Sequence, residues 1–93
     1  MIVLVAKITV KSGREQEFER TMLAAVPKVR EEPGNHAYIF NRAKDNPRMF
    51  MFYEQYGDQA ALEAHRAHLK EMGIDLAAFF DGPLVREWYD LIA

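Results

Sequence analysis

The sequence predicts an α+β fold of the ferredoxin-like type, in which two helices cover one face of an antiparallel four-stranded sheet. The first observation is the order β-α-β-β-α-β, in which segments of β-branched and aromatic residues alternate with segments of helical periodicity. The second is the length of 93 residues, which suits one compact domain. The third is the lack of any linker-like stretch or internal repeat, so we expect a single domain over residues 1–93.

The N-terminal segment predicts a buried strand followed by a helix. Residues 2–10 are dense in β-branched types and are followed by Lys11-Ser12-Gly13, which is typical of the end of a strand. Ser12 and Glu15 have the spacing of a capping box, in which each side chain would bond a free backbone N–H group. A helix should therefore begin at residue 13 or 14.

The first helix should bury one stripe of apolar residues, and it contains a proline. The stripe consists of Phe18, Met22, Ala25 and Val29. Pro27 removes one helical hydrogen bond, so we expect a kink near residues 23–24 or a break into a second short turn. Pro33-Gly34 should end the segment in either case.

The rest of the chain predicts a hairpin, a helix, a short connection and a last strand. Residues 36–43 and 49–56 are joined by turn-forming residues and should pair. Asp58 is a candidate N-cap for the second helix, which Gly73 should end. One face of that helix carries Leu62, His65, Leu69 and Met72. We expect a short helical connection within residues 74–81 and a final strand over residues 84–92.

Two of the predicted strands are apolar on both faces, although two helices can cover only one face of a sheet. In the third strand, Met49, Met51 and Tyr53 alternate with Phe50, Phe52 and Tyr56. A symmetric copy of the same chain is the simplest cover for the second face. We therefore expect a homodimer packed sheet to sheet.

Composition excludes several partners and compartments. The formal net charge is −2, which disfavours a nucleic-acid surface, and the RNA-binding domains that share this element order lack support because the basic, glycine-containing RNA-binding motif is missing. The longest apolar run, residues 1–6, is too short to span a membrane or to form a secretory signal. The chain has no cysteine, which suits a reducing cytoplasm, where we expect the protein to act.

Absent residue types also narrow the chemistry. Ser12 is the only serine and is assigned to a helix cap, so a Ser-His-Asp hydrolase is not expected. The five glycines stand singly, which excludes a P-loop and a glycine-rich dinucleotide site. Any reaction must use histidine, carboxylates, tyrosine, asparagine, arginine or tryptophan.

His65 is the first candidate, because it occupies a stripe where helical phase predicts leucine. It is either a core histidine with a single backbone hydrogen bond or, if kept neutral by burial, a base. His68 lies three residues further on. The two could chelate a metal, but local spacing offers no third ligand, so we expect no metal site.

Glu54 is the second candidate, because a carboxylate among strand aromatics needs a partner. It could form a structural ion pair, or it could orient His65 or bind a substrate hydroxyl. The pairing candidates are Arg42, Lys7 and Arg86. Tyr38, Tyr53, Asn41 and Trp88 are weaker candidates, since such residues are common in any half-buried sheet.

Two groups of residues resemble a known family. Glu32-Pro33-Gly34 followed by Tyr38 is similar to the segment joining the first helix to the second strand in antibiotic biosynthesis monooxygenase (ABM) domains. The run Tyr53-Glu54-Gln55-Tyr56, followed by Asp58, Ala61-Leu62 and His65, resembles the strand-to-helix signature of the same family.

This resemblance implies a dimeric ferredoxin-like α+β barrel that oxygenates small aromatic quinols or polyketide-like phenols with O2, without metal, flavin or haem. Glu54 and His65 take the positions of the family's recurrent polar pair. We further expect Tyr38, His68 and Trp88 to line the substrate pocket. Haem breakdown is disfavoured, because the haem-degrading relatives carry an asparagine near the middle of the first strand and residues 5–7 here are Val-Ala-Lys. A dimeric ligand-binding module without turnover and an isomerase of a small ketone remain alternatives.

Overall fold

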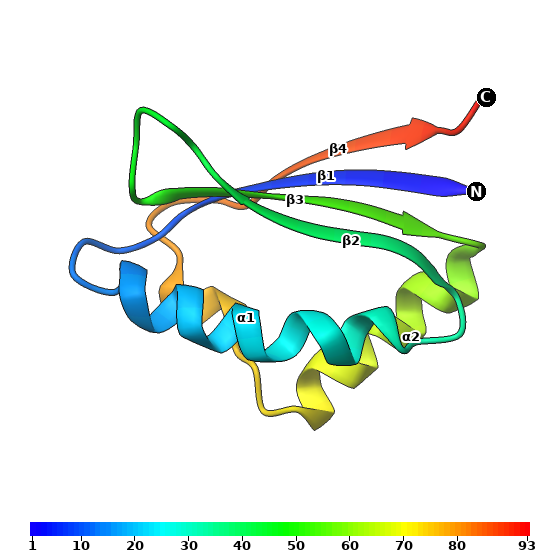
Figure 1. The fold of residues 1–93 in the computed structure, drawn as a ribbon, viewed down its shortest axis with the longest axis horizontal. Coiled ribbons are helices and arrows are strands. Elements are labelled where there is room, and N and C mark those ends of the chain that lie inside the picture. Colours follow the sequence, from blue (N-terminus) through cyan, green and yellow to red (C-terminus); the bar gives the residue numbers. More distant parts are fainter.

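A four-stranded antiparallel sheet carries two helices on one side in the computed structural model, which describes residues Met1 to Ala93 (Figure 1). The elements in chain order are β1 (Ile2–Thr9), α1 (Glu15–Arg30), β2 (Asn35–Arg42), β3 (Met49–Tyr56), α2 (Gln59–Glu71), the 3-10 helix η1 (Leu76–Phe79) and β4 (Val85–Asp90). The sheet order is β2-β3-β1-β4, and all neighbouring strands are antiparallel. The predicted ferredoxin-like order is confirmed.

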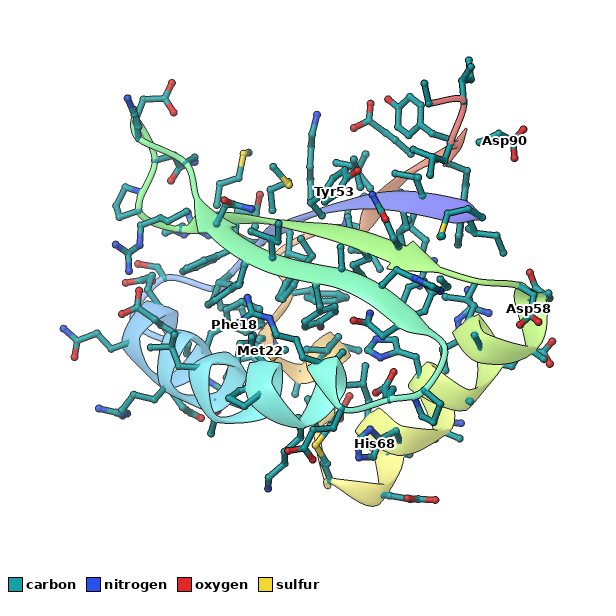
Figure 2. All side chains as sticks on the ribbon, turned by 45° about the vertical axis from the view of Figure 1, so that its right-hand side comes forward. Phe18, Met22, Tyr53, Asp58, His68 and Asp90 are labelled. Atoms are coloured by element: carbon teal, nitrogen blue, oxygen red, sulfur yellow. The ribbon has the colours of Figure 1, made fainter.

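The core lies between the sheet and the helices. Phe18, Met22, Ala25 and Val29 of α1 are all buried, as their spacing predicts. Phe18 and Met22 lie between α1 and the sheet (Figure 2). The Phe18 ring packs at 5.0 Å from the ring of Phe50 on β3. Alternate residues of the inner strands face this layer, because successive side chains of a strand point to opposite sides.

The start of α1 differs from the prediction. The helix begins at Glu15 and the Ser12 side chain makes no capping hydrogen bond. The expected capping box does not form, because Glu15 reaches back to the backbone N–H of Gly13, which donates to its Oε1 at 2.6 Å, and not to that of Ser12. Arg14 takes the N-cap position, and its guanidinium bonds the carbonyl of Ala78 at 3.1 Å. This longer-range contact holds the helix start against η1.

Pro27 does not break α1, which is one continuous helix through this residue. Pro27 lies on the exposed side of the helix, as does Leu23, whose carbonyl would have bonded an N–H at position 27. The unpaired carbonyl can therefore turn to water, which is why the proline is tolerated. Of the two expected outcomes, a kink or a break, the break is therefore wrong. At the other end of the chain, β4 is also shorter than the predicted strand of residues 84–92.

The sheet face turned away from the helices is uncovered and carries apolar residues together with the ion pair of Lys7 and Glu87. Ile39, Val85 and Tyr89 are each roughly half exposed there. Tyr53 also lies on this side (Figure 2). No helix of the structure has the length and apolar character needed to cross a membrane.

Candidate active site

His65 is buried at the centre of the helix-covered face. Asp58 caps α2 by accepting from the backbone N–H of Ala61 at 2.8 Å, and this start fixes the phase that turns His65 towards the sheet. Only 4 % of the residue is exposed. Its ring lies between two tyrosines, with ring centroids 5.3 Å from Tyr38 of β2 and 5.2 Å from Tyr56 of β3.

Glu54 reaches the same place from β3. Its Oε1 atom lies 3.8 Å from Nε2 of His65, so the two predicted residues are brought together in a buried site. The same oxygen accepts a 2.5 Å hydrogen bond from the hydroxyl of Tyr56. Burial raises the pKa of the Glu54 carboxyl to about 7, although the Tyr56 hydrogen bond acts in the opposite direction.

The structural ion pair considered for Glu54 does not form. Arg42 pairs with Glu19, and Lys7 pairs with Glu87 at 3.1 Å. Arg86 makes no salt bridge with Glu54, although its positive charge lowers the pKa of the carboxyl. Glu54 therefore has tyrosine and histidine as neighbours in place of a bonded cation.

Glu32 is the site residue that sequence reasoning missed. Its carboxylate lies between two histidines, with Oε1 3.1 Å from Nδ1 of His65 and Oε2 2.7 Å from Nδ1 of His68. A carboxylate can only accept, so Nδ1 of His65 carries the hydrogen and Nε2 keeps its lone pair. Burial lowers the pKa of His65, and the nearby Glu32 charge acts in the opposite direction. At neutral pH His65 is therefore a neutral imidazole whose basic nitrogen faces Glu54.

The turn between α1 and β2 sets the position of Glu32. The Glu32 backbone N–H donates to the carbonyl of Val29 at 3.0 Å, and its carbonyl accepts from Asn35 at 3.1 Å. Gly34 allows this turn to lie against α2, because a Cβ added there would come within 2.2 Å of the Cβ of Ala61. In the Glu-Pro-Gly motif, the glycine thus allows the turn to pack closely against α2, and the glutamate accepts hydrogen bonds from the two histidines.

An apolar cavity of about 80 Å³ opens beside His65 and Glu54. It is lined by Leu4, Ala6, Ile8, Tyr38, Phe52, Glu54, Leu62, His65, Arg66, Leu69, Leu76, Leu84 and Arg86. Every fully buried side-chain nitrogen or oxygen atom in the structure has a hydrogen-bond partner. Nε2 of His65, Oε2 of Glu54 and the Tyr38 hydroxyl have no hydrogen-bond partner in the protein, so each keeps some exposed surface, and all three residues line the cavity.

The remaining predicted site residues lie elsewhere. His68 faces a second, larger hollow together with Glu32, and it does not line the cavity beside His65. Trp88 is half exposed on the edge strand β4, beside Ile2 and Gln59. The expectation that both line one pocket with Tyr38 is corrected. The alternation of side chains along β4 predicts on which face of the sheet Trp88 lies. It does not predict how far Trp88 lies from α2.

No group of three or more histidine, cysteine or acidic side chains has an arrangement that could hold a metal ion. His65 and His68 do share one carboxylate, but both direct Nδ1 at it. Glu32 therefore links the two histidines through hydrogen bonds.

The sequence model of the family "Antibiotic biosynthesis monooxygenase" matches residues 1–71. The chain belongs to this family. The matched residues include all of α1, β2 and β3 and α2 up to its last residue, and so contain Glu32, Glu54 and His65. A comparison with functionally curated proteins finds no match.

Solved structures share the fold of this ABM family member over 95 % or more of its length. PA3566 from Pseudomonas aeruginosa is 26 % identical with a TM-score of 0.87, and the alignment covers 99 % of this chain and 94 % of that chain. A conserved protein from Methanosarcina mazei Go1 is 27 % identical with a TM-score of 0.83, covering 95 % and 89 % of the two chains. An antibiotic biosynthesis monooxygenase is 24 % identical with a TM-score of 0.89 and full coverage of both chains, which shows the shared fold.

Proposed function

We propose that the protein is a cofactor-independent monooxygenase that oxygenates a small, electron-rich aromatic quinol or phenol with O2. The observation that carries the proposal is the position of His65, which lines an apolar cavity while Glu32 holds its Nδ1. A base held in this way can take a proton from a bound substrate. The substrate anion can then pass an electron to O2 itself, so the protein need not supply a redox group.

Glu54 and Tyr38 complete the proposed chemistry. With a pKa of about 7, the Glu54 carboxyl exists in both protonation states near neutral pH, so it can bind a substrate hydroxyl as donor or acceptor. Burial raises the pKa of Tyr38, which therefore keeps its proton. Its free hydroxyl can donate a hydrogen bond to the oxyanion that develops when His65 removes the proton.

The apolar walls suit an aromatic ring, but the cavity is small. Its volume of about 80 Å³ is below the roughly 150 Å³ of a cavity that holds benzene. A ring must therefore displace part of the wall. Leu76 of η1 and Leu84, which follows the connection, belong to that wall and are only partly buried. They are the side chains that we expect to move.

We include a homodimer in the proposal. Support comes from the uncovered sheet face, where Ile39, Val85 and Tyr89 remain roughly half exposed in the single chain. A two-fold partner would cover the same patch on both copies. Burial of this face would also add to the limited core of a 93-residue domain.

Oxygen uptake tests the proposed activity. In the oxygenation of anthrone, the ring CH2 becomes a carbonyl and O2 supplies one oxygen atom to the product and one to water. We expect the wild-type protein to accelerate O2 uptake with anthrone or menadiol, and His65→Ala to lower kcat by roughly 10²-fold or more. Glu54→Gln should also slow the reaction, and a chelator should not.

His36→Ala is the matched control, because His36 is an exposed histidine outside the cavity. Equal rates for wild type, His65→Ala and Glu54→Gln, after subtraction of autoxidation, would contradict the proposal. Saturable quinol binding without any O2 uptake would instead indicate a ligand-binding module.

A further inference from the structure

We propose that Glu32 is a proton relay that connects His65 to water in a second hollow, separate from the substrate cavity, with His68 as the residue that positions it. This inference rests on the proposed role of His65 as a base. The proposal describes how a proton passes from His65 to water after His65 has taken a proton from the substrate.

The contacts form a continuous chain. Nδ1 of His65 lies 3.1 Å from Oε1 and 3.2 Å from Oε2 of Glu32, so its hydrogen is shared between the two oxygens. His68 binds Oε2 at 2.7 Å. The spacing of three residues on α2 places both imidazoles on one side of the helix, against the turn that carries Glu32. His68 thereby fixes the carboxylate that receives the His65 proton.

Exposure to solvent increases along this chain. The exposed fraction of the side chain is 5 % for His65, 11 % for Glu32 and 30 % for His68. Glu32 lines an open hollow of about 590 Å³ together with Lys28, Glu31, Pro33, Gly34, Ala61, Ala64 and His68. None of these residues lines the cavity beside Nε2 of His65. The two ring nitrogens of His65 thus have different surroundings, because the residue lines the mainly apolar cavity while its Nδ1 contacts Glu32, which lines the second hollow.

The proton balance closes over one turnover. His65 takes the substrate proton at Nε2 and gives its Nδ1 hydrogen to Glu32, which releases a proton to water in the second hollow. After O2 has bonded to the substrate carbon, the second C–H bond and the O–O bond break to form the carbonyl and hydroxide, and Nε2 of His65 returns its proton to the hydroxide, which leaves as water. Glu32 then takes a proton from the second hollow and restores the hydrogen on Nδ1. Charge and tautomer return to the starting state, and bulk water need not enter the substrate cavity.

Two substitutions separate a relay from a structural contact. Glu32→Gln keeps the size and polarity of the side chain but cannot carry the proton, so we expect kcat to fall at least tenfold with little change in KM. In Glu32→Ala, kcat should fall by the same factor. Added formate should restore kcat, because the hollow is large enough to admit formate. His68→Gln should retain most activity, since the amide can still donate to Glu32. Glu31→Gln is the matched control, a neighbouring glutamate lining the same hollow.

A measurement without substrate separates this proposal from the proposed oxygenase function. The NMR line shape of the His65 ring 13Cε1 signal during a pH titration reports how fast the ring gains and loses its proton. We expect proton exchange at least tenfold slower in Glu32→Gln than in wild type and in Glu31→Gln. Slowed exchange in a protein that shows no O2 uptake would support the relay and contradict only the oxygenase. Equal exchange rates, or wild-type kcat in Glu32→Gln, would overturn the relay.

Discussion

The hydroxyl of Tyr56 donates a 2.5 Å hydrogen bond to Oε1 of Glu54, two residues earlier on the same face of β3. This bond stabilises the charged carboxylate, yet burial outweighs it and the pKa of Glu54 is raised to about 7. The site thus holds a carboxyl group that changes its charge within the physiological range, next to a neutral imidazole.

Removal of the Tyr56 hydroxyl should raise the pKa of Glu54 further above about 7. In Tyr56→Phe the charged form loses its only hydrogen-bond donor while the burial remains. A 13C NMR titration of the glutamate carboxyl signals would measure the change. Tyr53→Phe is the control, because Tyr53 lies on the opposite face of the same strand and accepts its bond from Gln55. An unchanged or lowered pKa in Tyr56→Phe would contradict this account.

Glu54 should make the folded state less stable as the pH rises. Its pKa is about 7 in the folded state against an ordinary value of 4.5, so between these values the folded state binds more protons and the free energy of unfolding falls with increasing pH. Glu54→Gln removes this dependence. Relative to wild type, the variant should gain on the order of 3 kcal/mol between about pH 4.5 and about pH 8.

Urea denaturation at fixed protein concentration would measure this difference. His65 contributes to the pH dependence of stability with the opposite sign. Its pKa is lowered in the folded state, so its contribution to the free energy of unfolding is favourable at a pH above its ordinary pKa and is lost as the pH falls. Comparison of the two proteins at each pH cancels most of that contribution. A difference in stability that does not vary with pH would show that Glu54 is not the titrating group.

Gly34→Ala should loosen the turn that carries Glu32. The added Cβ would lie 2.2 Å from the Cβ of Ala61, so the turn and α2 must separate, at a cost of about 1–3 kcal/mol. Activity should fall as Glu32 moves away from His65. Ala61→Gly removes the clashing atom, so the double variant should lose less stability than the sum of the single variants. Additive losses in thermal or urea unfolding would show that this contact does not set the turn.

The exposed sheet face should control self-association. Ile39→Glu places a charge on the uncovered face of β2, so we expect a mass near 10.8 kDa by light scattering where wild type shows twice that mass. Leu23→Glu is the matched control, since Leu23 is an exposed leucine on the outer side of α1. Dissociation by Leu23→Glu alone, or a monomeric wild type, would contradict a sheet-to-sheet dimer.

The sequence was sufficient to predict the element order and the burial of the α1 stripe, because both follow from local periodicity. It was insufficient for the start of α1. Ser12 has the right spacing for a cap, but Arg14 takes the N-cap position and contacts Ala78, a residue far along the chain that local spacing cannot indicate. Of the two outcomes predicted for Pro27, a kink or a break, the break does not occur, and the choice between them depends on whether the freed carbonyl faces water, which requires knowledge of the exposed side of the helix.

For the site, periodicity singled out His65 and the interrupted strand pattern singled out Glu54, and these two do meet. Sequence reasoning did not identify Glu32 as the hydrogen-bond partner of His65 and His68, because Glu32 lies in a turn and belongs to no periodic pattern of residues. Its signal was the Glu-Pro-Gly motif, whose Pro33-Gly34 indicates a turn, and Gly34 packs closely on Ala61 of α2. Trp88 was misplaced because its distance from α2 depends on the twist and edge position of β4.

The narrow space beside His65 has a kinetic consequence. Since the resting walls leave too little room for an aromatic ring, association should be gated by an opening step near η1 rather than by diffusion. In a stopped-flow experiment the observed binding rate would then level off at high ligand concentration. The plateau value would measure the rate at which the protein opens near η1.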